Sequence, residues 1–221
     1  NFGDILAGWY AAQMGLPAGH FVCASNDNKV LYDFFRTGVY DRNRAFHVTV
    51  SPSMDILISS NLERLLCHMG GQDKTKAEMA ALQAEGKYTA EITEERISGE
   101  FADEAETFDA IRRVYKNTGY VMDTHTAVAY AAAEKYRAES STKNPMVIVS
   151  TASPYKFTKD VMTALDEKYA DGDAFALMKE MEKVSGVAIP APIRGIETRE
   201  IRHKNVCEKD GIADFVKGWL L

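Results

Sequence analysis

Hydrophobic residues at helical spacing begin the chain. Residues 4–14, D-I-L-A-G-W-Y-A-A-Q-M, place apolar side chains three and four positions apart, which predicts an amphipathic helix. The glycine and proline of G-L-P at 15–17 form a helix stop signal. We therefore expect a first helix that ends close to residue 14.

Three segments have the composition of β-strands. F-V-C-A-S at 21–25 is a short apolar run bounded by polar residues, and F-H-V-T-V at 46–50 alternates, so both are predicted strands. P-M-V-I-V-S-T-A at 145–152 is the clearest strand pattern, because its consecutive apolar residues are mostly β-branched, as in a central parallel strand. Ligands bind at the carboxyl ends of such strands, so the following S-T-A-S-P loop is a candidate ligand-binding segment.

Helices are predicted between these strands. One follows N-D-N at 26–28 and is ended by the glycine of R-T-G-V-Y, and another covers the end of 53–66, where Leu62, Leu65 and Leu66 form an apolar stripe. Further helices are expected at 126–138, 158–168, 173–184 and 209–219. Alternating strands and helices imply an α/β fold with a helix-covered, mostly parallel sheet.

Residues 70–118 differ from the rest. They are polar and Ala-rich, with acidic residues early and basic residues late in each expected helix, as the helix dipole favours. We predict a helical insert at 70–118 within one α/β domain that spans residues 1–221.

Composition excludes several classes of protein. The chain has 221 residues, 46% of them hydrophobic, and a formal net charge of -6, which argues against nucleic-acid binding. No apolar run approaches the roughly 20 residues that cross a bilayer. Three widely spaced cysteines are typical of a reducing compartment, so we expect a cytoplasmic protein. The missing initiator methionine favours a fragment.

Candidate chemistry begins at N-F-G-D, residues 1–4. The start of a helix offers unpaired N–H groups that bind phosphate, and Gly3 permits a close approach of the backbone. The alternative, which the local pattern favours, is that Asp4 is an ordinary N-cap.

Two other segments carry polar groups that could bind a ligand. Ser150 and Thr151 follow the predicted strand, where they could bind a ligand or only end the strand and begin a turn. In D-T-H-T-A, residues 123–127, Asp123 is a candidate cap and His125 is a base, a ligand or a structural hydrogen-bonding residue. No metal-binding spacing, Walker loop, G-x-G-x-x-G or nucleophile elbow is present.

Taken together, the segments resemble threonine synthase, a pyridoxal 5'-phosphate (PLP) enzyme of fold type II. The resemblance rests on N-F-G-D-I-L-A-G-W-Y-A-A-Q-M-G-L-P, F-F-R-T-G-V-Y, S-P-S-M-D-I-L-I-S-S-N-L-E-R-L-L, D-T-H-T-A and S-T-A-S-P-Y-K-F. These motifs occur in the family's order from residue 1 to about 157, and they match the C-terminal part of the enzyme's large domain.

The resemblance implies a cofactor site. Asn1, Phe2, Gly3 and Asp4 match the end of the family's S-G-N-F-G-D loop, which grips the PLP phosphate. Thr151 matches the threonine that bonds the pyridine nitrogen in the family's T-A-H-P motif.

Some positions depart from the family's motifs. Ser153 replaces the histidine of T-A-H-P, and Thr124 replaces the proline of D-P-H-T-A. Lys156 falls on the lysine of the family's T-A-H-P-type motif, which S-T-A-S-P-Y-K-F matches here. The resemblance assigns this lysine no role.

The family's Schiff-base lysine lies in an upstream F-K-D-F-like motif that this chain lacks. We therefore expect the intact enzyme to convert O-phospho-L-homoserine and water to L-threonine and phosphate, and the chain alone, without the missing N-terminal half, to be inactive. The alternatives are another fold-type-II lyase such as a serine/threonine dehydratase, a non-catalytic binding protein derived from the enzyme, or a structural α/β domain.

Overall fold

The computed structural model describes residues 2–220, and the chain divides into two compact units, Asn1–Ala188 and Ile189–Leu221. Within the described residues, all strands belong to the first unit: β1 Phe21–Ser25, β2 Val39–Asp41, β3 Lys87–Thr89 and β4 Ile97–Phe101. Its α-helices are α1 Gly3–Gln13, α2 Val30–Thr37, α3 Leu62–Gly70, α4 Gln72–Glu85, α5 Glu104–Thr118, α6 Thr124–Ser140, α7 Thr158–Leu165 and α8 Ala174–Ser185.

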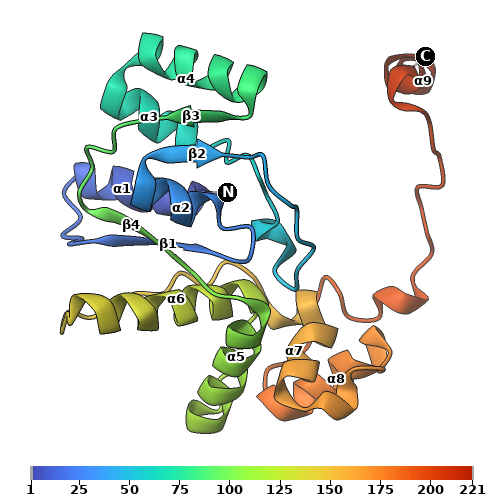
Figure 1. Cartoon of the computed structure of the whole chain (residues 1–221). Helices are drawn as coiled ribbons and strands as arrows, with labels where there is room; N and C mark the ends of the chain where they lie inside the picture. The colour runs from blue at the N-terminus through green and yellow to red at the C-terminus, as the bar shows by residue number, and fades with distance from the viewer. Residues whose placement is uncertain (1, 221) are drawn as a thin grey trace. The chain divides into compact units, whose positions relative to one another are not determined.

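A parallel pair of strands lies at the centre of the first unit. β1 and β4 run in register from Phe21 opposite Ile97 to Ser25 opposite Phe101. Helices α1 and α2 cover one face of this pair and α6 covers the other (Figure 1). The layered arrangement confirms the predicted α/β class with helices on both faces of a parallel sheet.

Gly99 permits close contact between α2 and β4. A Cβ atom at this position would lie 2.7 Å from Tyr32 Cα and 3.2 Å from the Tyr32 carbonyl oxygen. Both atoms belong to the backbone of α2, so no side chain could rotate away to make room. The absence of a side chain at Gly99 therefore determines how near α2 packs to the sheet.

A second, antiparallel pair carries an aromatic cluster. β2 and β3 pair from Val39 opposite Thr89 to Asp41 opposite Lys87, and the rings of Tyr40 and Tyr88 stack at 5.1 Å. This cluster belongs to one hydrophobic core with α1, α2 and α3, made of Phe2, Leu6, Trp9, Cys23, Val30, Leu31, Phe34, Tyr40, Leu62, Leu65, Leu66, Leu82, Tyr88, Ala90 and Ile97. The predicted stripe on α3 is thus confirmed as buried.

The strand predicted at 145–152 is wrong. Within residues 2–220 this segment pairs with no strand, and Val147 and Val149 are 89% and 59% exposed. Strands are stabilised by hydrogen bonds to a neighbour and by burial of their side chains. The β-branched composition is present here, but those two conditions are not met.

The strand predicted at 46–50 is also wrong, for a different reason. The side-chain amide of Asn28 donates to the carbonyl of His47 (2.8 Å) and accepts from the N–H of His47 (2.9 Å). The carboxylate of Asp55 accepts from the N–H of Thr49 (2.9 Å). Side chains therefore satisfy the backbone groups that a neighbouring strand would otherwise pair with.

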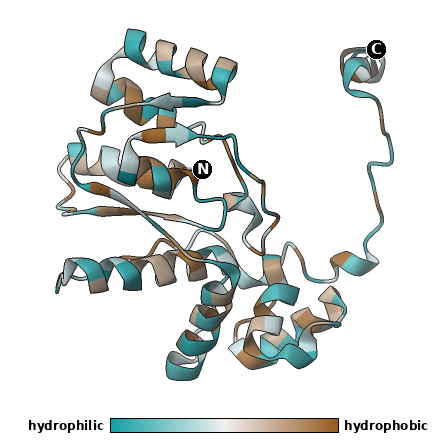
Figure 2. Cartoon of the chain, viewed as in Figure 1, coloured by the Kyte–Doolittle hydropathy of each residue, from teal (hydrophilic) through white to brown (hydrophobic). Residues whose placement is uncertain are grey.

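Residues 70–118 are not helical throughout. They contain β3 and β4 between α4 and α5, so the helical character predicted around 89–100 is wrong, and β4 pairs with β1. The start of α5 is stabilised by a capping box between Asp103 and Glu106. The ribbon of α5 is mostly teal or white in Figure 2, which fits a helix with much of its surface in solvent.

As far as residue 220, the second unit contains short 3-10 turns and one α-helix, α9, Ile212–Leu220. The helices expected near 4–14, 126–138, 158–168, 173–184 and 209–219 are confirmed as α1, α6, α7, α8 and α9. No helix within residues 2–220 is long and apolar enough to cross a lipid bilayer.

Candidate functional site

The start of α1 has the features of an anion-binding site. Phe2 is the N-cap residue, with φ 59° and ψ 3°, and no side chain caps the helix. Its left-handed backbone is uncommon for a residue other than glycine, and such strain concentrates at functional sites. The first N–H groups of α1 are therefore without a capping side chain and carry the positive end of the helix dipole.

The residues predicted around this helix start have different positions. Phe2 is buried and stacks on Phe35 at 5.7 Å, while Gly3 and Asp4 are exposed in the first turn of α1. Asp4 is therefore not the N-cap, and the alternative that the local pattern favoured is wrong. Asn1 lies outside the described residues.

Asn61 is a neighbour of Gly3 that sequence reasoning missed. A Cβ atom at Gly3 would lie 3.4 Å from Asn61 Nδ2, so the side-chain amide of Asn61 lies beside the start of α1. Arg64 donates a hydrogen bond to Asn61 Oδ1 and orients that amide. Asn61 is the asparagine of S-S-N-L-E-R, a segment that contributed to the family resemblance but was not predicted to belong to the site.

A buried polar network lies at the carboxyl end of β1. Asn26 follows the strand, is 2% exposed and donates through Nδ2 to Asp55 Oδ1 (2.8 Å) and Thr49 Oγ1 (2.8 Å). Asn28 donates to the same carboxylate oxygen at 3.1 Å. Buried amides that are hydrogen-bonded in this way fix the surrounding backbone, so the network holds the 49–55 loop at the end of the sheet.

A second network lies at the start of α6. Asp123 caps the helix by accepting from the N–H groups of His125 (2.9 Å) and Thr126 (3.3 Å), which confirms the predicted cap. His125 is 4% exposed, and its Nε2 accepts from the N–H of Ser53 at 3.0 Å. It is therefore the structural hydrogen-bonding residue among the alternatives. Ser150 Oγ lies 3.0 Å from Thr126 Oγ1.

Electrostatics keeps Asp123 ionised. Burial alone would raise the pKa of its carboxyl, but hydrogen bonds from the His125 and Thr126 side chains and backbone outweigh burial and lower that pKa below its usual range. The carboxylate is thus a permanent acceptor at neutral pH.

Thr151 and its neighbours are on the surface. Thr151 is exposed, and within residues 2–220 no hydrogen bond joins it to Phe2, Gly3 or Asp4. Ser153 caps a 3-10 turn by accepting from the N–H of Tyr155, and Lys156 Nζ lies 5.4 Å from the ring of Phe157. Within residues 2–220, the two predicted parts of the cofactor site are therefore not joined to each other by a direct hydrogen bond.

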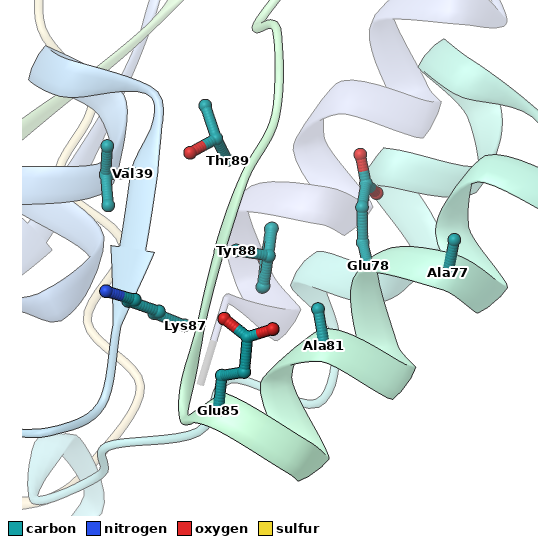
Figure 3. Close-up of a pocket in the computed structure, with 8 residues that line it drawn as sticks. All are labelled: Val39, Ala77, Glu78, Ala81, Glu85, Lys87, Tyr88 and Thr89. Carbon is teal, nitrogen blue, oxygen red and sulfur yellow. The ribbon is translucent and has the colours of Figure 1, made fainter.

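A groove of the first unit lies elsewhere. It has a volume of about 430 Å³ and is lined by Val39, Ala77, Glu78, Ala81, Glu85, Lys87, Tyr88 and Thr89, from α4 and the β2–β3 pair (Figure 3). The described members of the predicted site, Phe2, Gly3, Asp4 and Thr151, do not line it. Residues 2–220 contain no cluster of three or more His, Cys, Asp or Glu side chains that could hold a metal ion.

A family model and curated relatives match the chain. Residues 126–216 match the family model "Threonine synthase, C-terminal". Human threonine synthase-like 1 is 41% identical over a stretch that covers 76% of this chain and 23% of that protein. Threonine synthase of Saccharomyces cerevisiae is 34% identical and is matched over 95% of this chain and 45% of that protein. The chain thus spans less than half the length of these relatives.

Solved structures of threonine synthases are similar to this chain in fold. The yeast threonine synthase structure covers 99% of this chain, and 45% of its own chain is matched, with a TM-score of 0.81 and 30% identity. The PLP-bound threonine synthase of Brucella melitensis covers 90% of this chain and is matched over 40% of its own, with a TM-score of 0.70 and 32% identity. By sequence and by fold, the chain belongs to the threonine synthase family and matches the C-terminal part of its members.

Proposed function

We propose that this segment supplies the phosphate-binding helix start and the ring-nitrogen hydroxyl of a PLP site in a threonine synthase. The intact protein would convert O-phospho-L-homoserine and water to L-threonine and phosphate. The observation that carries the proposal is the uncapped start of α1 at N-F-G-D, in a chain 34% identical to yeast threonine synthase.

The groups in the chain fit the cofactor. Main-chain N–H groups of residues 3–5 form the positive end of α1, and Gly3 leaves the approach beside Asn61 open. Thr151 is exposed and has a neutral hydroxyl, which can bond a pyridine nitrogen without transferring a full proton to it. A phosphate and a ring nitrogen are the two ends of PLP that need such partners.

Each residue has a binding or orienting task. When bound, PLP supplies an electron sink for negative charge at the substrate carbons. The start of α1 would hold the phosphate, and the Thr151 hydroxyl would keep the ring nitrogen largely unprotonated. Asn61 would orient a phosphate oxygen through Nδ2.

The proposal includes a partner and a location. The Schiff-base lysine of the family has no counterpart in this chain, so the remaining N-terminal part of the enzyme would supply it, and the chain alone would be inactive. A cytoplasmic location is part of the same proposal.

A second candidate function has its own support. Threonine synthase-like 1 proteins of primates are 41–42% identical to this chain, a higher identity than that of yeast threonine synthase. The chain would then belong to a threonine synthase-like protein that does not form threonine.

A chimera separates the two candidates. Residues 1–221 replace the matching part of yeast threonine synthase, and phosphate release and threonine formation from O-phospho-L-homoserine are measured beside the chain alone. We expect activity in the chimera and none in the chain. A folded chimera that binds PLP but forms no threonine would favour the second candidate, and threonine formation by the chain alone would refute the proposed inactivity.

A further inference from the structure

Asp123 is a buried carboxylate at the start of α6. Its role as the helix cap does not by itself explain why a charged residue is buried there. It is 1% exposed, and burying a charge is costly unless it is well bonded. Asn or Ser caps a helix about as well without a charge. Its Oδ1 already accepts from the N–H groups of His125 and Thr126, so Oδ2 is available for a further task.

That task is a bond with the Thr126 hydroxyl. Thr126 Oγ1 makes a short hydrogen bond with Asp123 Oδ2 and lies 3.0 Å from Ser150 Oγ. A hydroxyl has one hydrogen, and a bond to a carboxylate is stronger than a bond to a neutral oxygen. Thr126 Oγ1 is the donor to both Asp123 Oδ2 and Ser150 Oγ, so its one hydrogen is shared between these two acceptors, with the carboxylate as the stronger one.

The second branch runs through His125. Because Nε2 accepts from the N–H of Ser53 at 3.0 Å, it carries no proton, so the hydrogen of the neutral ring is on Nδ1. Nδ1 lies 3.3 Å from Asp123 Oδ1 and donates to it. The ring also packs on Phe157, with centroids 4.6 Å apart. One carboxylate thus connects the 51–54 loop with the segment that holds Ser150.

We infer that Asp123, His125 and Thr126 are positioning residues that fix Ser150, and through it Thr151, relative to the 51–54 loop. Thr151 adjoins Ser150 in the chain, and its hydroxyl makes no hydrogen bond within residues 2–220. The position of Thr151 is therefore determined by Ser150, which is anchored by its hydrogen bond with Thr126. The role of Thr151 rests on the proposed function, but its anchoring does not.

The first test measures order in the whole chain of residues 1–221. Thr126→Val removes the hydroxyl at nearly constant shape, and Thr126→Ser retains it. Thr107→Val is the matched control, because Thr107 is also buried near a helix start and its hydroxyl donates to the Asp103 carbonyl (2.7 Å), a backbone group. Amide order parameters of Ser150 and Thr151 are measured by NMR.

We expect Thr126→Val to lower the Thr151 order parameter from about 0.85 to below about 0.6. Thr126→Ser should restore it and Thr107→Val should leave it unchanged. Equal values in Thr126→Val and Thr107→Val would overturn the inference. The nitrogen shifts of the His125 ring should show a proton on Nδ1, and a proton on Nε2 would also overturn it.

A titration with PLP separates this inference from the proposed function. If the wild-type chain does not respond to PLP while Thr126→Val still loosens Thr151, the proposed function fails and the anchoring stands. If PLP shifts the Thr151 resonance equally in wild type, Thr126→Val and Thr107→Val, with unchanged order, the anchoring fails and the proposed function stands.

Discussion

Replacing Gly99 with alanine tests the packing that brings α2 against the sheet. The added Cβ atom would lie 2.7 Å from Tyr32 Cα and 3.3 Å from the Leu31 carbonyl oxygen, whereas carbon atoms pack best at about 3.5–4.0 Å. The backbone of α2 would have to move by about 1 Å. Overpacking of this kind costs about 1–3 kcal/mol, and we expect the upper end because main-chain atoms cannot rotate away.

The assay is thermal unfolding followed by calorimetry. For a chain of this length about 3 kcal/mol lowers the Tm by roughly 6–12 °C. Gly19→Ala is the matched control, because nothing lies within 4 Å of its Cβ position and its backbone is not left-handed. A Tm for Gly99→Ala equal to that of Gly19→Ala would refute the close approach of α2 to β4.

Three further predictions concern charge, the polar network and the thiols. Arg96 and Trp9 donate hydrogen bonds to Glu94 and lower its pKa to about 2. The stability that Glu94 provides is therefore present above its unfolded pKa of about 4.3 and is lost as pH falls towards 2, so Glu94→Gln should flatten the acid side of a plot of Tm against pH. Asp55→Ala removes the carboxylate that accepts hydrogen bonds from the amides of Asn26 and Asn28 and from the N–H of Thr49. Urea unfolding should show a loss of about 2–4 kcal/mol, against under about 0.5 kcal/mol for exposed Asp171→Ala. Cys207 is exposed, whereas burial raises the pKa of Cys23 to about 12, so mass spectrometry should find iodoacetamide on Cys207 first and on Cys23 only after unfolding.

Helices were predictable from the sequence because their signals are local. The apolar stripe of Leu62, Leu65 and Leu66 and the stop at Gly38 both lie within a few residues of the helix that they define. Each such helix has its own capping or termination signal. Local chemistry was therefore enough for most helices of the fold.

Strands were less predictable because pairing depends on distant residues. β4 has the unremarkable sequence I-S-G-E-F, yet it pairs with β1. The more β-branched segment at 145–152 pairs with no described strand. Composition indicated the capacity to form a strand but not the presence of a neighbour.

The candidate site was predicted only in part, for a similar reason. The motif at residues 1–4 indicated the start of α1, but Asn61 reaches Gly3 only through the packing of α3 against α1. The link from His125 to Ser53 joins residues 72 positions apart. Neither contact has a signature within a short stretch of sequence.

The proposed function requires the start of α1 and Thr151 to bind opposite ends of PLP. An NMR titration of the chain with PLP, repeated with pyridoxal that lacks the phosphate, tests it most directly. We expect PLP to shift the amides of residues 3–5 and of Thr151, pyridoxal to shift Thr151 alone, and Gly3→Val to abolish the shifts at α1. Shifts from PLP that leave residues 3–5 unmoved, or equal shifts there from pyridoxal, would contradict it.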